Sequence, residues 1–175
     1  MSENRESKGV VTRVEGKDLI IERVFNAPRE LVFKMFAEPE HLASWWGPQG
    51  WETENREFNF KPEGAWHYCM RCIDKSQGEF YGQESWGKAV YKEITEPERI
   101  VYIDYFSNEE GTIDDSLPET LATMTFVELG DKTKLVISSR YNSEEDLRKV
   151  VEMGVVEGVT SQFQRLEEHL AKLNK

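Results

Sequence analysis

Two cysteines three residues apart form the most suggestive short motif in the chain, because C-x-x-C occurs in redox and metal sites. The motif is Cys69-Met70-Arg71-Cys72. Redox motifs of this kind work at a helix N-terminus, where the thiol pKa is lowered, whereas residues 66–72 have the texture of a strand. Residues three apart in a strand point to opposite faces, so Cys69 and Cys72 would not share a face. Of the possible metal ligands here, only His67 and Cys69 would share one. Two ligands are too few for a structural zinc site, which needs four. We expect reduced thiols, no metal and no cofactor.

Three histidines are candidate general bases: His41, His67 and His169. His41 is the strongest of them, because it is near Trp45 and Trp46 at an expected cavity mouth. The chain has no G-x-S-x-G or H-E-x-x-H motif that would supply a catalytic partner. We expect His169 to be exposed, and a solvated or packing role is favoured for all three.

Carboxylates are abundant, with 33 Asp and Glu residues. A buried carboxylate would have a raised pKa and could transfer protons. Nothing in the sequence brings a chosen pair to one site. Six of them fall in or beside expected strands: Glu22, Glu52, Glu54, Glu57, Glu84 and Asp104.

The overall composition narrows the class of protein. A chain of 175 residues fits one domain, and its net charge of -11 disfavours nucleic acid as a partner. No apolar run approaches the roughly 20 residues of a membrane span, and the polar start lacks a secretory signal. Two cysteines are too few for a disulfide scaffold. We expect a cytoplasmic protein with no membrane insertion.

The elements that must position these groups begin after an expected mobile tail at residues 1–16, with a single domain at 17–175. Residues 19–25 are rich in β-branched and aromatic residues and predict a strand. Pro28 and Pro39 mark the starts of two short helices, the second of which ends at Gly47-Pro48. Residues 52–142 alternate between apolar and polar positions with turn residues between segments, which predicts six antiparallel strands in a meander.

A long helix is predicted from Ser143, whose side chain can cap it ahead of three acidic residues. Gly154 and Gly158 interrupt its middle, and Gly158 and Gln162 share its apolar face. A solid core would favour large apolar side chains there, so we expect a cavity beneath the helix. The apolar face contains Leu147, Val151, Val155, Val159, Phe163, Leu166, Leu170 and Leu173.

In their order, these segments resemble a known family. The segments are APRELVF, PEHLASWWGP, GAWHYCMRC, ETLATMTFVELGDKTKLVISSRY and MGVVEGVTSQFQRLEEHL. They are similar to the bacterial branch of the SRPBCC (START-like) superfamily, and more narrowly to the family named after the activator of heat-shock protein 90 ATPase, over residues 18–173. The resemblance implies an α+β helix-grip fold, in which a curved antiparallel sheet wraps around a long C-terminal helix and two short helices follow the first strand. Its relatives include lipid carriers, hormone receptors, cyclases and co-chaperones, so the fold alone selects no activity.

Three functions are compatible with the sequence. The first is a non-enzymatic carrier or sensor that binds a small hydrophobic ligand, aromatic ligands included, behind an entrance guarded by Trp45 and Trp46. The second is an enzyme of cyclase, hydrolase or isomerase type, which orients substrate in the same cavity with Tyr68, Tyr102, Ser139 or Gln162. The third is an interaction module with an acidic surface, and contact with a chaperone or a second copy of the chain stays open. The expected cavity lining is Phe58, Phe60, Trp66, Tyr68, Met70, Met124, Phe126, Gly158, Val159, Gln162 and Phe163.

Overall fold

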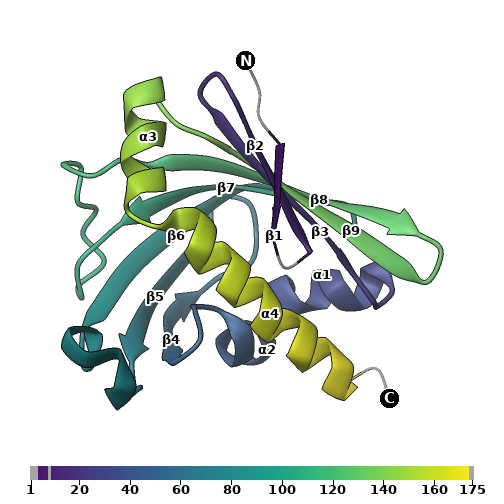
Figure 1. Ribbon diagram of the computed structural model, residues 1–175, viewed down its shortest axis with the longest axis horizontal. Helices are drawn as coiled ribbons and strands as arrows, with labels where there is room; N and C mark the ends of the chain where they lie inside the picture. Colours follow the sequence, from purple (N-terminus) through teal and green to yellow (C-terminus); the bar gives the residue numbers. More distant parts are fainter. Residues whose placement is uncertain (1–3, 8, 174–175) are drawn as a thin grey trace.

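One antiparallel sheet forms the framework of the protein (Figure 1). The structure is a computed structural model that describes residues 4–7 and 9–173, and within them the sheet has nine strands in the order β1-β2-β3-β9-β8-β7-β6-β5-β4. The six strands β4 to β9 are consecutive neighbours, so the predicted meander is confirmed. The strands are β1 (Asn4–Ser7), β2 (Val10–Glu15), β3 (Asp18–Phe25), β4 (Trp51–Phe58), β5 (Ala65–Cys72), β6 (Glu84–Thr95), β7 (Arg99–Phe106), β8 (Thr120–Leu129) and β9 (Lys132–Arg140).

The sheet curves around the C-terminal helix. The strand pairing shifts register between Asn55 and Glu57 in β4, and again between Tyr91 and Glu93 in β6. An extra residue in one strand bends that strand and increases its twist. These two bulges therefore help the sheet to fold over its own concave face, where the interior of the protein lies.

The prediction of a mobile tail over residues 1–16 is wrong for the two strands found there. β1 and β2 extend the sheet beyond β3, and Arg13 donates to Glu22 of β3 at 2.8 Å. Most of β2 is only half-buried. A strand that buries neither face completely shows no clear alternation of apolar residues, so the sequence pattern did not reveal it.

Two short helices cover one end of the concave face (Figure 1). Helix α1 (Arg29–Ala37) follows Pro28, and α2 (Pro39–Trp45) has Pro39 in its first turn, as predicted. Proline suits the start of a helix because the first N–H groups have no helical partner. Helix α1 buries Val32, Phe33, Met35 and Phe36 against the sheet.

The predicted single C-terminal helix is two helices, α3 (Glu144–Glu152) and α4 (Val155–Leu173). Gly154 separates them with φ +96°, a left-handed conformation that favours glycine. Ser143 caps α3 by accepting from the Asp146 N–H at 3.0 Å, as predicted. Between β5 and β6 the chain forms the 3₁₀ helix η1 (Lys75–Phe80).

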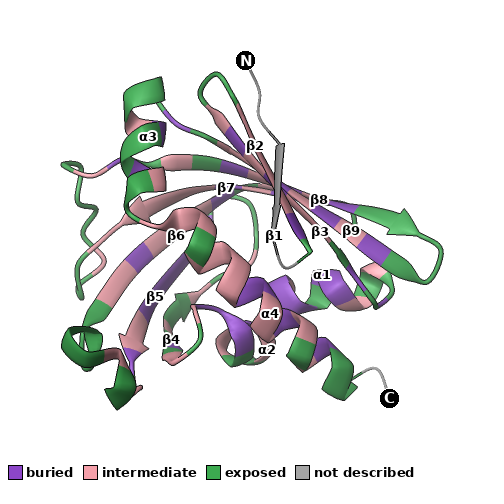
Figure 2. Ribbon diagram, in the orientation of Figure 1, coloured by how far each residue is buried: buried purple, intermediate pink, exposed green. Residues whose placement is uncertain are grey.

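The buried side chains are distributed unevenly along α4 (Figure 2). Gln162, Phe163, Leu166 and Leu170 are buried, whereas Val155, Val156 and Val159 are only half-buried. The later turns of α4 contact α2, and its first turns lie beyond α1 and α2 (Figure 1). The interior is therefore well filled at one end and less filled at the other. Among the described residues, no helix is long and apolar enough to span a membrane.

Candidate functional site

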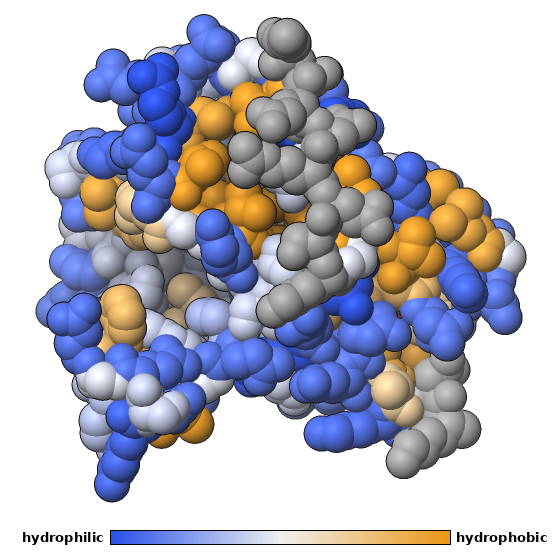
Figure 3. All heavy atoms as spheres, viewed as in Figure 1, coloured by the Kyte–Doolittle hydropathy of each residue, from blue (hydrophilic) through white to orange (hydrophobic). Residues whose placement is uncertain are grey.

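A cavity of about 250 Å³ lies between the concave face of the sheet and the first turns of α4. Val150 of α3, Val155 and Val159 of α4, and inward side chains of the sheet surround it. In Figure 3 the surface is hollowed below α3 and beside the start of α4. A cavity lined mainly by apolar and aromatic side chains with a few polar groups is typical of small-molecule sites.

Seven of the residues expected to contact a ligand line this cavity. They come from the end of α2, from β5, from β8 and from α4, which are far apart in the sequence but meet in space. These seven are Trp46, Tyr68, Met70, Met124, Val159, Gln162 and Phe163.

Six of the expected residues do not line the cavity: Trp45, Phe58, Phe60, Trp66, Phe126 and Gly158. Phe58, Phe60, Trp66 and Tyr91 form an aromatic cluster whose rings contact one another, with Phe60 and Tyr91 at 5.0 Å between centroids. Edge-to-face contacts of this kind stabilise a packed core. These rings therefore fill the interior instead of enclosing space.

Phe126 and Gly158 lie elsewhere for different reasons. Phe126 is 1% exposed and packs edge-on against Phe33 and Phe36 of α1. Gly158 is half-buried, and a Cβ built on it would have no heavy atom within 4 Å beyond its immediate neighbours. The backbone at Gly158 is therefore not pressed against the sheet, and Gly158 is not among the residues that line the cavity.

The two tryptophans expected at an entrance lie in the interior. Trp45 is 0% exposed, and its Nε1 donates to the Met35 carbonyl at 3.2 Å, so the expectation is wrong for this residue. Trp46 lines the cavity but is only 8% exposed. Its Nε1 is buried without a hydrogen-bond partner among the described residues. Because this nitrogen has almost no accessible surface, it is packed among neighbouring side chains and does not face the cavity.

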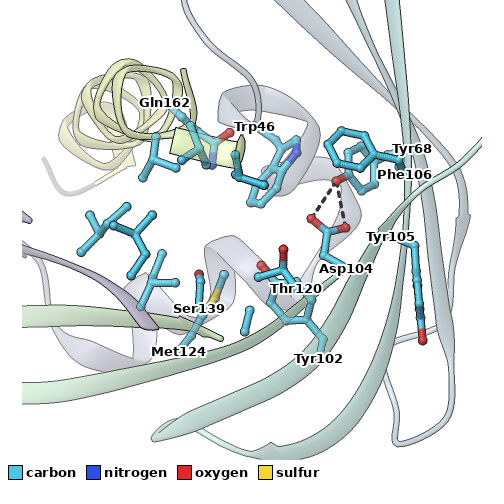
Figure 4. Close-up of a pocket in the computed structure, with 18 of the residues that line it drawn as sticks. Trp46, Tyr68, Tyr102, Asp104, Tyr105, Phe106, Thr120, Met124, Ser139 and Gln162 are labelled. Carbon is cyan, nitrogen blue, oxygen red and sulfur yellow. Dashed lines mark hydrogen bonds between the residues drawn. The ribbon is translucent and has the colours of Figure 1, made fainter. Parts of the chain in front are cut away.

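Helix α4 holds the turn that carries Trp46. Gln162 Oε1 accepts from the Gly47 N–H at 2.9 Å, and the amide nitrogen of Gln162 points toward the cavity (Figure 4). Arg165 Nη1 donates to the carbonyls of Trp46, Gly47 and Trp51 within 3.1 Å. In the structure it fixes the position of Trp46.

Asp104 is the carboxylate that the sequence could not single out. It lies on β7 in phase with the buried residues Ile100 and Tyr102, so its side chain points to the concave face. The Tyr68 hydroxyl donates to Asp104 Oδ1 at 3.2 Å and to Oδ2 at 3.4 Å (Figure 4). Burial raises the pKa of Asp104 to about 7, although the hydrogen bond from Tyr68 lowers it.

A glycine on the neighbouring strand makes room for Tyr68. Gly87 of β6 pairs with Tyr68 of β5, and a Cβ built on Gly87 would lie 2.5 Å from Tyr68 Cζ and from the hydroxyl oxygen. Real Cβ contacts are not that short. The missing side chain of Gly87 therefore allows the Tyr68 ring to reach Asp104.

The histidine candidates are not part of the cavity lining. His41 and His169 contact each other through Nδ1 and Nε2 at 3.1 Å. The expectation that His169 is simply exposed is wrong, because it packs against α2 and is half-buried. His67 is 6% exposed and shares a hydrogen bond with the Asn108 carbonyl at 3.0 Å, in contact with the outward ring of Trp86.

The two cysteines lie in β5, as the strand prediction requires. Both are free and buried, and burial raises the pKa of the Cys69 thiol. Among the residues that the structure describes, no three His, Cys, Asp or Glu side chains come together as a metal site would need.

Several cavity residues were not among the expected ligand contacts. Tyr102 and Ser139 had been considered only for an enzyme, and Asp104 only as one of six strand carboxylates. The phase of β7 was the signal available, because RIVYIDYF places Asp104 with Ile100 and Tyr102 on one face. Further lining residues that sequence analysis missed are Phe106, Thr120, Ala122, Ile137 and Tyr141.

Comparisons with known proteins agree with this architecture. A solution structure from Arthrobacter aurescens is 26% identical with a TM-score of 0.81, covering 97% of this chain and 91% of that one. A crystal structure from Mycobacterium smegmatis is 24% identical with a TM-score of 0.80, covering 95% and 96%. A solution structure from Staphylococcus epidermidis is 27% identical with a TM-score of 0.77, covering 91% and 92%.

The search of curated proteins gave no match. A family model, described as activator of Hsp90 ATPase homolog 1-like protein, matches residues 26–171. This match spans most of the chain, from the end of β3 through α4. The SRPBCC resemblance and the helix-grip fold expected from the sequence are therefore confirmed, and the chain belongs to the AHSA1 family.

Proposed function

We propose that this protein binds a small, largely apolar molecule in the cavity beneath α4, as a carrier or sensor in the cytoplasm. The observation that carries the proposal is the cavity itself, which has a volume of about 250 Å³ and a mainly apolar and aromatic lining. Protein interiors are normally packed with few voids larger than a water molecule. A space of this size next to a well-filled aromatic cluster supports a binding role.

The polar groups of the cavity support a ligand with one polar end. Asp104 and Tyr68 lie at one side of the cavity, and the amide nitrogen of Gln162 points toward it (Figure 4). The remaining side chains offer apolar surface to the body of the ligand. A few placed polar groups in an apolar cavity fix orientation and give specificity.

Binding can be tested by thermal unfolding with a panel of fatty acids, flavonoids and polyketide-like aromatics, followed by titration of each hit. A ligand at 100 times its Kd should stabilise the protein by about 2.7 kcal/mol. Native mass spectrometry of protein purified from its own host would identify a co-purifying molecule directly.

A matched pair of variants locates the binding site. Val159→Phe adds a ring inside the cavity, whereas Val24→Phe adds the same ring at a position that is 47% exposed on β3. We expect the first variant to lose binding and the second to keep it. Equal binding by both folded variants would place the ligand elsewhere, and no binding by the unmodified protein to any panel member would contradict the proposal.

A second candidate function is proton-transfer catalysis on the bound molecule, as in a cyclase or isomerase. The specific observation in its favour is the pKa of Asp104, which burial raises to about 7, close to the value at which a general acid or base works best. Turnover of an identified ligand that disappears in Asp104→Asn, with binding retained, would establish the enzyme.

A further inference from the structure

Asp104 is a carboxylate without a cationic partner in the cavity. Among the described residues that line the cavity there is no Lys, Arg or His. The only side-chain hydrogen bonds described for its carboxylate come from the Tyr68 hydroxyl, at 3.2 and 3.4 Å. Burying a carboxylate is costly unless it is paired. The site therefore has one negative group that a bound cation would compensate.

Aromatic rings surround this carboxylate. Trp46 and Tyr68 contact each other edge-on with centroids 5.9 Å apart, and Tyr102 precedes Asp104 by two residues on the same face of β7. Figure 4 shows Asp104 between Tyr68 and Tyr102, with Trp46 beside Tyr68. The faces of Trp and Tyr attract a cation, and most strongly when it is removed from water.

The net charge of the whole chain also favours a cationic ligand. With a net charge of -11, the protein attracts cations and repels anions. A fatty acid or another anionic ligand would have to bring a second negative charge next to Asp104. A neutral hydroxyl could donate to Asp104, but it would leave the negative charge of the carboxylate uncompensated.

We propose that the cavity binds a small apolar amine, with its ammonium group against Asp104 and the rings of Tyr68, Tyr102 and Trp46, and its apolar body beneath Val155 and Val159 of α4. This inference rests on the proposed binding function and specifies the ligand class. It assigns to Asp104 the recognition of positive charge, and to the Tyr68 hydroxyl the orientation of the carboxylate.

Three naphthalene probes of similar size test the proposal: 1-naphthylmethylamine, 1-naphthylmethanol and 1-naphthoic acid. Isothermal titration at pH 8 should give the amine at least about 10-fold tighter binding than the alcohol, because a hydrogen bond between charged groups exceeds a neutral one by that much. The acid should bind most weakly. The same order in the Asp131→Asn control, which removes an equal charge at the exposed turn between β8 and β9, would exclude a general effect of net charge.

Asp104→Asn should lower the affinity for the amine about 10-fold or more and leave the affinity for the alcohol within about 3-fold. Its fold is checked by circular dichroism. Where that variant fails to fold, acidification of the unmodified protein provides the same change. From pH 8 to pH 5.5, Asp104 gains a proton while an alkylamine stays charged, so the affinity for the amine should fall about 10-fold or more.

The other titratable side chains that interact with Asp104 stay uncharged over this range. They are Tyr68 from β5, Tyr91 from β6, Tyr102 from β7 and Tyr141 after β9, and burial raises the pKa of each one above its ordinary value of 10. Tyr105 points away from the cavity in Figure 4. A pH-dependent affinity for the amine can therefore be assigned to Asp104.

The outcomes separate the two proposals. Binding of the alcohol as tight as that of the amine, or a preference for the acid, would overturn the inference about amines and leave the binding function intact. Failure of all three probes to bind would overturn the inference about amines, and the binding function itself falls only if the wider panel also fails to bind. An amine preference that survives Asp104→Asn would also overturn the inference, because another group would then hold the charge.

Discussion

A single half-buried carboxylate sets the chemical character of the cavity. Asp104 lies between aromatic rings, and its hydrogen bond from Tyr68 compensates only part of the cost of removing it from water. A residue that lowers stability at neutral pH is more readily explained by ligand recognition or catalysis than by folding. Functional sites commonly contain such groups.

The pH dependence of stability follows from the direction of this shift. The pKa of Asp104 is raised to about 7 in the folded protein, so between about pH 4 and pH 7 the folded state binds more protons than the unfolded state. Its contribution to stability is therefore present at acid pH and is lost as the pH rises through 7. We expect Asp104→Asn to increase the free energy of unfolding by about 4 kcal/mol at pH 8 and by almost nothing at pH 4, as measured by urea denaturation. A variant less stable than the parent at pH 8 would contradict this assignment.

Gly87 tests how strictly Tyr68 is positioned. Because a Cβ at this position would lie 2.5 Å from the Tyr68 ring, Gly87→Ala should displace the ring and destabilise the protein by about 1–3 kcal/mol. The clash needs both side chains, so the double variant Gly87→Ala with Tyr68→Ala should lose less than the sum of the two single changes. Additive losses would show that Gly87 acts independently of Tyr68.

At the scale of elements, the break between α3 and α4 matters most for the cavity. A continuous helix was predicted, but the left-handed conformation at Gly154 changes the chain direction where the cavity lining begins. Val150 before the break and Val155 after it both line the cavity. The break therefore places two helices over one cavity.

The two glycines of this region should respond oppositely to alanine. Gly154→Ala puts a Cβ into a left-handed conformation and should cost about 1 kcal/mol. Gly158→Ala has helical neighbours and open space, so it should stabilise the protein by about 0.5–1 kcal/mol. Thermal unfolding of both variants decides the matter, and a destabilised Gly158→Ala would indicate tight packing that the structure does not show.

The contact between α2 and α4 contains the pair His41 and His169. Burial, His41 and Lys172 all lower the pKa of His169. For a histidine with a lowered folded pKa, the unfolded state binds more protons, so stability is lost as the pH falls below about 6.5. We expect His169→Gln to weaken this loss between pH 7 and pH 5, relative to the unmodified protein, in denaturation at each pH. An unchanged pH profile would mean that the two rings do not interact in solution.

Elements with one buried face could be predicted from the sequence. Elements without a clearly buried face could not. Strands β4 to β9 show alternation because the concave face is apolar, whereas β2 is half-buried along most of its length and carries charged pairs such as Arg13 with Glu22. The helix break depended on the backbone angle of Gly154, which its residue type permits but does not require.

The site was partly predictable for a related reason. Inward positions such as Tyr68, Met124 and Val159 follow from the period of their own strand or helix. Whether an inward side chain lines the cavity or fills the core depends on the elements that pack over it. Phe126 is covered by α1, whereas Met124 of the same strand faces the cavity. The six strand carboxylates could not be ranked from the sequence. Only the folded sheet shows that Asp104 is the one of them that lines the cavity.

On the scale of the whole molecule, the interior is divided into two parts. Beneath α1, α2 and the later turns of α4, large side chains such as Phe33 and Phe126 are in close contact and almost wholly buried. Beneath α3 and the first turns of α4, the same sheet encloses the cavity. The packed part can hold the fold, which leaves the other part free to remain open without loss of the structure.

The same substitution in the two parts should therefore have different effects on stability. Val32 of α1 is 0% exposed in the packed part, and Val159 of α4 lines the cavity. Val32→Phe has no space for the added ring and should lower the free energy of unfolding by about 1–3 kcal/mol or more, because overpacking forces side chains out of their preferred rotamers. Val159→Phe fills existing space, and its buried apolar area offsets the loss of rotamer freedom, so the change should stay within about 1 kcal/mol. Urea denaturation of the two variants under one condition measures the difference, and equal destabilisation would show that the cavity is closed by repacking in solution.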